Sequence, residues 1–232
     1  MKNLVFYLML HYPDKESFFR ILELLDKEKA GYVEIGIPVS DPYVDGGVIR
    51  QTHKEVLEKG LTKGEVIHTL EEIRRRFAFK VVLMTYKEGV EHFCLSHVPK
   101  DLYDGFICVD EEYQPGSFHN QIAVLGQSLD REGIARALKH NELFAYVVSG
   151  EGKTGSFQKL PEEYVEVVKI VKSVSKIPAY VGFGIKTAGD VSEVMKHGAD
   201  GAIIGTEFIR RYQHGGMKAL NAYLEELKKV AA

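Results

Sequence analysis

Short apolar runs alternate with longer amphipathic segments from one end of the chain to the other. The short runs are rich in β-branched and aromatic residues and predict strands, whereas apolar residues spaced three and four apart predict helices. Strands are predicted at residues 4–10, 32–37, 80–85, 105–109, 121–125, 143–149, 179–183 and 201–205. Helices are predicted at residues 15–29, 47–58, 63–76, 89–95, 130–139, 161–174, 188–197 and 217–228. This alternation predicts an α/β protein with a parallel sheet and helical crossovers.

Eight predicted strands favour a closed barrel, because dividing 232 residues among them leaves 29 for each unit, about one strand and one helix. We therefore expect a single (β/α)8 TIM barrel over residues 1–232. Residues 99–105 and 113–120 are too short for full helices, so loops or single turns are expected there. The alternative, an open doubly wound sheet, should have a glycine-rich nucleotide loop after its first strand. No such loop is present there, and the pattern Gly182-Phe183-Gly184 lies late and lacks the third glycine of a dinucleotide motif.

Composition and charge exclude several classes of protein. The chain is 45% hydrophobic and 27% charged, which is typical of a globular domain, and its net charge of −3 argues against a nucleic-acid partner. The apolar run at residues 4–10 is too short to span a membrane and no cleavage site follows it, so a cytoplasmic protein is expected. Cys94 and Cys108 favour buried, reduced thiols over a disulfide. Nine scattered histidines include no His-x-x-x-His pair, so neither a metal site nor a cofactor is expected.

Acidic residues mark the end of the second predicted strand. Glu34 lies within an apolar strand, where poor hydration is expected to raise the pKa of its carboxyl group. The loop that follows, residues 38–47, contains Asp41 and Asp45, and each has two candidate roles: capping the next helix or facing the same cavity as Glu34. Two carboxylates in different environments are typical of an acid/base pair. The alternative for Glu34 is a structural core carboxylate paired with a lysine or tyrosine.

Glycine-rich segments follow the last three predicted strands, at residues 149–155, 182–185 and 205–206. At the carboxyl ends of barrel strands, glycines let backbone amides approach a ligand, and a helix that begins near Thr206 would add its positive end. Three such segments in adjacent units favour a phosphate-binding site without a metal. The alternative is that these glycines only end strands and start helices.

The same clusters closely resemble the α subunit of tryptophan synthase. The segment 34–47, EIGIPVSDPYVDGG, is similar to the family motif, in which a glutamate, hydrophobic residues and a glycine precede Pro-Phe-Ser-Asp-Pro-x-Ala-Asp-Gly-Pro. The likeness continues in the same order at residues 83–86, 146–149, 154–155, 181–185 and 199–206, and so covers most of the chain. The resemblance implies a lyase that cleaves indole-3-glycerol phosphate to indole and glyceraldehyde 3-phosphate in tryptophan biosynthesis.

The resemblance also implies a role for each matching residue. Glu34 would move the protons, and Asp45 would hold the indole N–H as positive charge develops on the ring. Tyr146 matches a tyrosine of the family's pocket, and Thr154 matches a loop threonine that orients the aspartate. The phosphate site would be formed by Gly155, Gly184, Gly205 and Thr206.

The resemblance further implies a tryptophan synthase β-subunit partner in an α2β2 assembly. Two segments that help to bind the β subunit in the family read Tyr86-Lys87-Glu88-Gly89 and Asp110-Glu111-Glu112 in this chain, and both differ from the family pattern. Three other functions stay open. They are a barrel that binds the phosphate ligand and regulates a β partner, a lyase that acts alone, and an isomerase or epimerase of phosphosugars with a related phosphate site.

Overall fold

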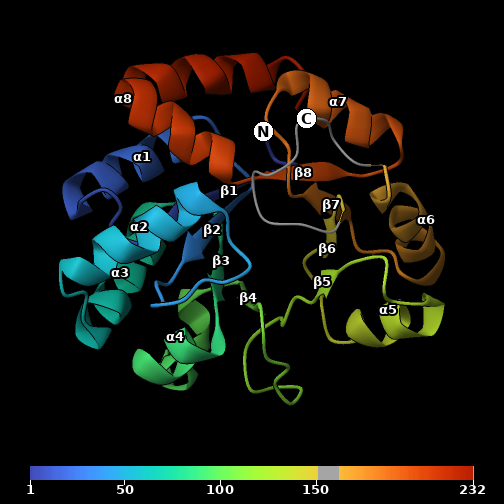
Figure 1. Ribbon diagram of the computed structural model, residues 1–232, viewed down its shortest axis with the longest axis horizontal. Coiled ribbons are helices and arrows are strands. Elements are labelled where there is room, and N and C mark those ends of the chain that lie inside the picture. The colour runs from blue at the N-terminus through green and yellow to red at the C-terminus, as the bar shows by residue number, and fades with distance from the viewer. Residues whose placement is uncertain (151–161, 232) are drawn as a thin grey trace.

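A computed structural model describes residues 1–150 and 162–231, and a parallel sheet of eight strands forms its centre (Figure 1). The strands are β1 (Leu4–Met9), β2 (Tyr32–Gly36), β3 (Lys80–Thr85), β4 (Gly105–Cys108), β5 (Val124–Leu125), β6 (Ala145–Val148), β7 (Ala179–Gly182) and β8 (Gly201–Ile204). Their order is β4-β3-β2-β1-β8-β7-β6-β5, and neighbouring strands run parallel. Each predicted strand is present, so the predicted parallel sheet is confirmed.

The two ends of this strand order meet, which closes the sheet into a barrel. The backbone N–H of Phe106 in β4 donates to the carbonyl of Asn120 over 3.2 Å, and the N–H of Ile122 donates to the carbonyl of Phe106 over 2.8 Å. These bonds form a parallel bridge between Phe106 and Gln121, just before β5. The strands therefore form a nearly closed (β/α)8 barrel, as the strand count predicted.

Helices surround the barrel on its outside (Figure 1). They are α1 (Lys15–Lys27), α2 (Gly47–Glu58), α3 (Lys63–Arg76), α4 (Lys87–His92), α5 (Arg131–Ala137), α6 (Tyr164–Val174), α7 (Ala188–Lys196) and α8 (Thr206–Lys228). Both α2 and α3 lie between β2 and β3, whereas the segment 109–123, all of which is described, contains no helix. Two short 3-10 turns, Leu95–His97 and Lys100–Leu102, precede β4. Loops and single turns were expected in these two regions, and that expectation is confirmed.

The last helix is longer than the predicted segment 217–228. It begins at Thr206 and is bent at Gly215 and Gly216, which both have non-helical backbone angles. Gly216 has a φ of +57°, a conformation that glycine adopts without steric cost. The first half of α8 leads away from the barrel centre, and the second half runs across the outside towards α7 (Figure 1). The predicted helix is thus only the part of α8 that follows the bend.

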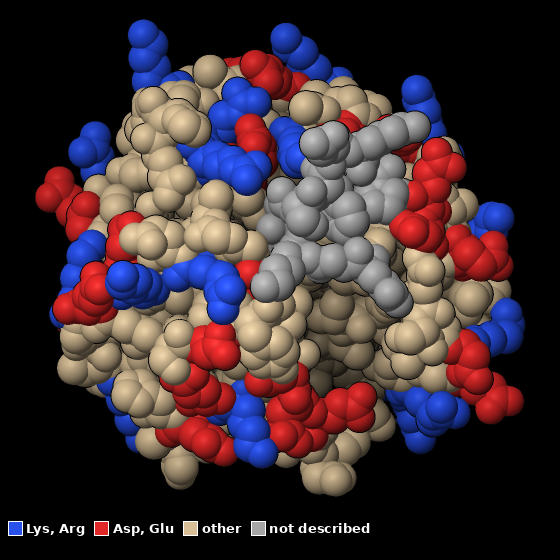
Figure 2. All heavy atoms as spheres, viewed as in Figure 1, with Lys and Arg blue, Asp and Glu red and all other residues tan. Residues whose placement is uncertain are grey.

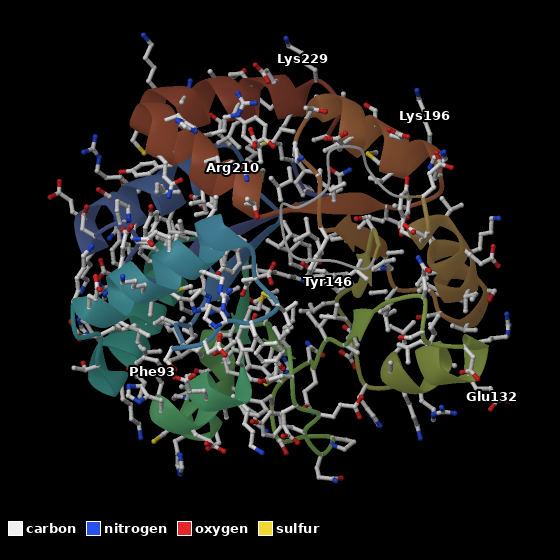
Figure 3. The ribbon with its side chains drawn as sticks, in the orientation of Figure 1. Phe93, Glu132, Tyr146, Lys196, Arg210 and Lys229 are labelled. Carbon is white, nitrogen blue, oxygen red and sulfur yellow. The ribbon has the colours of Figure 1, made fainter. Side chains whose placement is uncertain are left out.

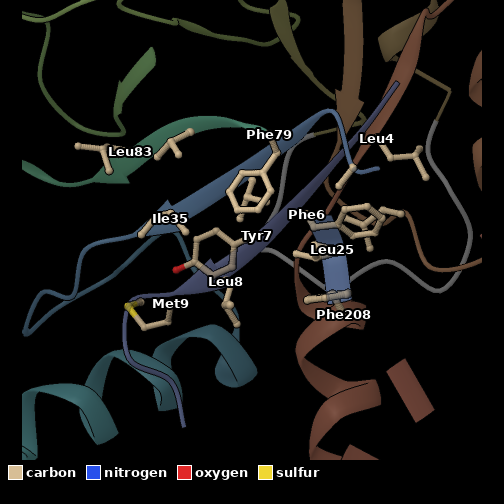
Figure 4. Packing of buried hydrophobic residues seen from close by; sticks show 14 of the residues in the cluster. Leu4, Phe6, Tyr7, Leu8, Met9, Leu25, Ile35, Phe79, Leu83 and Phe208 are labelled. Atoms are coloured by element: carbon tan, nitrogen blue, oxygen red, sulfur yellow. The ribbon is translucent and has the colours of Figure 1, made fainter. Parts of the chain in front are cut away.

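Two groups of buried side chains fill the molecule. The larger group lies between strands and helices, where the ring of Phe6 in β1 packs against Phe208 of α8 with centroids 5.2 Å apart (Figure 4). The smaller group includes Tyr32, Phe144 and Tyr180, whose ring centroids lie 5.0, 5.2 and 5.8 Å apart. These three residues lie at or near the amino-terminal ends of their strands. They therefore fill the barrel beneath the carboxyl ends, where sites of such barrels lie.

Both cysteines are free thiols, as predicted, but the prediction that they are buried is wrong. Cys94 follows α4 in a turn with a φ of +50°, and Cys108 is the last residue of β4, where the strand reaches the rim of the barrel. Each is partly exposed because its segment ends at the surface. Among the described residues, no helix combines the length and the apolar character that crossing a membrane requires.

Candidate active site

One pocket lies at the carboxyl ends of the strands, and most of the site residues predicted from the sequence line it. The predicted site residues that line it are Glu34, Asp45, Tyr146, Gly184, Gly205 and Thr206. Thr154 and Gly155 lie outside the described residues. All predicted site residues that the structure describes therefore meet where barrel enzymes hold their substrates.

Glu34 is a buried carboxyl group that lines this pocket from the middle of β2. It pairs in register with Tyr7 of β1 and Val82 of β3, and it is 1% exposed. Its Oε1 atom has no hydrogen-bond partner among the described residues, which argues against a structural core carboxylate held by a lysine or tyrosine. Burial and, to a smaller extent, the negative charge of Asp45 raise the pKa of Glu34 from 4.5 to about 8, in the direction that the sequence predicted. Glu34 therefore carries a proton at neutral pH.

The substitution Glu34→Gln is expected to change how stability depends on pH. The folded state keeps the Glu34 proton up to about pH 8, whereas the unfolded chain releases it near 4.5, so the stability of the wild type falls as pH rises between these values. Glutamine has no proton to lose. In urea titrations the variant should gain stability relative to the wild type by at most roughly 1.4 kcal/mol per pH unit across this window. Parallel curves for the two proteins would contradict a raised pKa.

Asp45 is oriented by two neutral side chains. The Tyr86 hydroxyl donates a hydrogen bond of 2.7 Å to Asp45 Oδ2, and His53 Nε2 lies 3.8 Å from the same oxygen. The backbone N–H of Val39 donates to His53 Nδ1 over 2.9 Å, so the ring proton is on Nε2 and faces the aspartate. Burial lowers the pKa of His53 to about 4, which keeps the ring neutral at pH 7. Asp45 thus presents a carboxylate of fixed orientation to the pocket.

The two aspartates of the loop 38–47 have different surroundings. Asp41 is exposed, and its Oδ1 atom pairs with Arg50 Nη2 over 3.0 Å at the surface. Asp45, in contrast, is 7% exposed and lines the pocket. The N-cap position of α2 is taken by Gly46 and by neither aspartate. The sequence left two roles open for Asp45, and the structure supports the second of them: Asp45 faces the same cavity as Glu34.

Apolar and aromatic side chains surround the acid pair. They are Tyr7, Ile49, Met84, Tyr146, Phe183, Ile185 and Ile203. Two of the rings need a glycine beside them, because a Cβ atom at Gly36 would lie 2.2 Å from the Tyr7 hydroxyl and one at Gly182 would lie 2.9 Å from the Tyr146 ring. These glycines let large rings enter the pocket, and the resulting lining suits a flat aromatic ligand.

Gly184, Gly205 and Thr206 form a part of the pocket that is rich in backbone amides. Gly184 has a φ of +90°, a conformation that residues with a side chain rarely adopt. Gly205 is the N-cap of α8 and Thr206 is its first residue, so the free N–H groups of this helix lie at the pocket. Such an arrangement attracts an anionic group such as phosphate.

Charge is unevenly distributed on the face shown in Figure 2. Acidic side chains gather along the lower rim, over α4 and the segment after β4, which contain Glu88, Glu91, Asp110 and Glu111. Basic side chains lie on the opposite side, over α8. An anionic group is therefore favoured on the side of α8.

Sequence reasoning missed four side chains of this region: Tyr7, His53, Tyr86 and Arg210. Tyr7 lies in an apolar run, and Arg210 lies in the first half of α8, of which the sequence indicated only a start near Thr206, so neither residue had a local signal of its own. The one available signal was the position of Tyr86 directly after a predicted strand, where barrel sites are built. In the described part of the chain, no group of three His, Cys, Asp or Glu side chains is arranged to hold a metal ion.

Comparisons with known proteins agree on one family. The family model described as tryptophan synthase alpha chain matches residues 1–231. The tryptophan synthase alpha chains of Pyrococcus furiosus and Prochlorococcus marinus subsp. pastoris are each 29% identical to this chain over 97% of its length, which corresponds to 97% and 87% of their own lengths.

Solved structures give the same result. The tryptophan synthase α-subunit of P. furiosus has a TM-score of 0.85 and 26% identity over 98% of both chains. Tryptophan synthase from M. tuberculosis has a TM-score of 0.84 and 25% identity over 99% of this chain and 93% of its own. Because the family model spans nearly every residue and the fold agrees along the whole length, this chain belongs to the tryptophan synthase alpha chain family.

Proposed function

We propose that this chain is a carbon–carbon lyase that cleaves indole-3-glycerol phosphate to indole and glyceraldehyde 3-phosphate, as a cytoplasmic step of tryptophan biosynthesis. The observation that carries the proposal is the presence in one pocket of two unlike carboxyl groups, Glu34, which is protonated at neutral pH, and Asp45. Membership of the family supports the same reaction. We also propose that residues 1–232 act as a single domain.

In this proposal Glu34 moves the protons. Its carboxyl group donates a proton to C3 of the indole ring, which makes the ring a cationic indoleninium. The resulting carboxylate then takes the proton of the hydroxyl on the adjacent glycerol carbon. As that O–H bond breaks, a C=O bond forms, the C–C bond to the ring breaks, and its electrons neutralise the ring. The products are an aldehyde and indole, Glu34 regains its proton, and the reaction as written calls for no cofactor.

Asp45 has a different role. Its carboxylate accepts the indole N–H and stabilises the positive charge that the ring acquires in the first step. This interaction is stronger in the charged intermediate than in the neutral substrate, which is what accelerates a reaction. The hydrogen bond from Tyr86 and the nearby N–H of His53 fix the orientation of the carboxylate before the substrate binds.

The rest of the substrate fits the rest of the pocket. The apolar lining, which includes Tyr146, suits the indole ring, and the amides at Gly184, Gly205 and Thr206 suit the phosphate. An isomerase or epimerase of phosphosugars has no use for such an aromatic lining, so we do not favour that alternative. By the resemblance alone, Thr154 orients Asp45 and Gly155 binds the phosphate.

We infer that a tryptophan synthase β subunit is the partner, in an α2β2 assembly. The segments 86–89 and 110–112, which match partner-binding segments of the family, lie against each other in this chain. The backbone N–H of Lys87 donates to Asp110 Oδ1 over 2.7 Å, and Lys87 Nζ pairs with Glu111 Oε2 over 3.0 Å. A partner that binds both segments would therefore contact one continuous surface. The residues of this surface differ from those of the family pattern.

Indole release from indole-3-glycerol phosphate tests the proposed function. We expect slow release by the isolated chain and faster release when a β subunit is added, because a partner that closes the site excludes water and completes it. Fast release without the partner would identify a lyase that acts alone. No release in either mixture would contradict the proposed lyase, and if both the wild type and Glu34→Ala then activate the β subunit, the barrel is a regulatory subunit.

A further inference from the structure

The phosphate end of the pocket contains positively charged side chains in addition to backbone amides. Lys186 and Arg210 line the same pocket as Gly184, Gly205 and Thr206. Backbone amides at a helix terminus supply only partial charges, whereas a guanidinium or ammonium group supplies a full one. The pocket therefore has more positive charge than a cradle of amides alone provides.

Arg210 has a position from which it can reach a group bound at the start of α8. It follows Thr206 by four residues, so both side chains lie on one face of the helix, about one turn apart. Figure 3 labels Arg210 on the first half of α8 and Tyr146 at the centre of the barrel. The first half of α8 thus brings both a free helix terminus and a guanidinium group to the pocket.

The arginine is available for a ligand, since within the described residues it forms no hydrogen bond and no ion pair, although it is partly buried. The neighbouring acid that lines the pocket, Glu207, is occupied by another residue, because Arg211 Nε pairs with Glu207 Oε1 over 2.7 Å. A partly buried guanidinium group with no partner among residues 1–150 and 162–231, beside free amides, is an arrangement suited to an anion with several oxygens.

The bend in α8 holds in place the loop that faces Arg210 across the phosphate end of the pocket. After Gly216 the helix turns back, and the Tyr223 hydroxyl donates to the backbone carbonyl of Lys186 over 2.8 Å. The Arg211 guanidinium lies 4.9 Å from the centre of the Tyr223 ring and so connects the two halves of the helix. The loop with Gly184 and Lys186 and the helix with Arg210 are therefore held in place relative to each other before a ligand binds.

We propose that Arg210 binds the phosphate group of the substrate through its guanidinium group and makes the enzyme select phosphorylated over unphosphorylated substrates. The inference extends the proposed function, because it assigns a side chain to the phosphate end of the same pocket. The planar guanidinium donates to two phosphate oxygens at once, a geometry that the amides of α8 complete from the other side.

Three variants test this inference: Arg210→Gln, Arg210→Lys and the control Lys218→Gln. The control removes a positive charge from an exposed position of the same helix that does not line the pocket. Binding of glycerol 3-phosphate is measured by calorimetry, and KM and kcat are measured with indole-3-glycerol phosphate and with the same compound lacking its phosphate. Circular dichroism and Tm establish that each variant is folded.

We expect Arg210→Gln to weaken glycerol 3-phosphate binding and to raise KM about ten- to a hundredfold, the usual contribution of a hydrogen bond between charged groups. The kcat should stay within about twofold, and Arg210→Lys should restore part of the affinity. Cleavage of the unphosphorylated compound and all constants of Lys218→Gln should not change. Equal binding by Arg210→Gln and wild type, or an equal loss for both substrates, overturns the inference.

The binding measurement separates this inference from the proposed function. If the wild type releases indole and Arg210→Gln has unchanged constants, the inference fails and the proposed function stands. If the wild type binds glycerol 3-phosphate through Arg210 and releases no indole, the phosphate-binding role of Arg210 stands and the proposed function fails.

Discussion

Glu34→Gln is expected to lower the rate of indole release by about 10²–10⁴-fold, the range that a positioned general acid and base contributes. Glutamine has nearly the same shape as protonated glutamic acid, so the pocket keeps its form. Its amide, however, neither donates a proton to indole C3 nor accepts the glycerol proton. Both proposed steps lose their proton carrier, and the effect should therefore appear in kcat with little change in KM.

Turnover of the purified variant with indole-3-glycerol phosphate, followed as indole release, measures this effect. A suitable control is Glu28→Gln, because Glu28 is also buried but pairs with Lys228 and does not line the pocket. The control should keep the kcat of the wild type even if its Tm falls. A Glu34→Gln variant that retains more than about a tenth of the wild-type kcat would exclude Glu34 as the proton carrier.

Much of the fold followed from local periodicity, because each strand of a parallel barrel is buried on both faces and reads as a short apolar run. The kink in α8 did not follow, since Gly215 and Gly216 divide the helical pattern, and the sequence indicated only a helix start near Thr206 and a separate helix from residue 217. The closure between β4 and β5 also had no local signal. It depends on a bridge between Phe106 and Gln121 that only the tertiary structure brings together.

The candidate site, too, could be predicted only in part from the sequence. Glu34 could be predicted as a site residue because a carboxylate is unusual inside an apolar strand. The structure places it in the pocket. The partners of Asp45 were not visible, because Tyr86 comes from the end of β3 and His53 from the middle of α2. Contacts between distant segments have no periodic pattern. Such partners are therefore found only from the structure.

Asp45→Asn is expected to lower the rate of indole release by about 10²–10³-fold, the usual cost of losing one group that stabilises a developing charge. Asparagine has the shape of aspartate, and its amide oxygen still accepts the hydrogen bond from Tyr86, so the loop keeps its geometry. The variant lacks the negative charge that stabilises the indoleninium. Single-turnover measurements should show the loss in the chemical step, with substrate binding less affected.

The same variant should also change the pH dependence of the reaction, because the two carboxyl groups interact. After burial, the negative charge of Asp45 is the second cause of the raised pKa of Glu34. Removing that charge lowers the pKa of Glu34, so its protonated form is lost at a lower pH and the alkaline limb of kcat against pH moves to lower pH. Asp41→Asn, in the same loop but exposed, should leave both the rate and this limb unchanged. An alkaline limb that stays in place in Asp45→Asn would mean that the negative charge of Asp45 does not raise the pKa of Glu34.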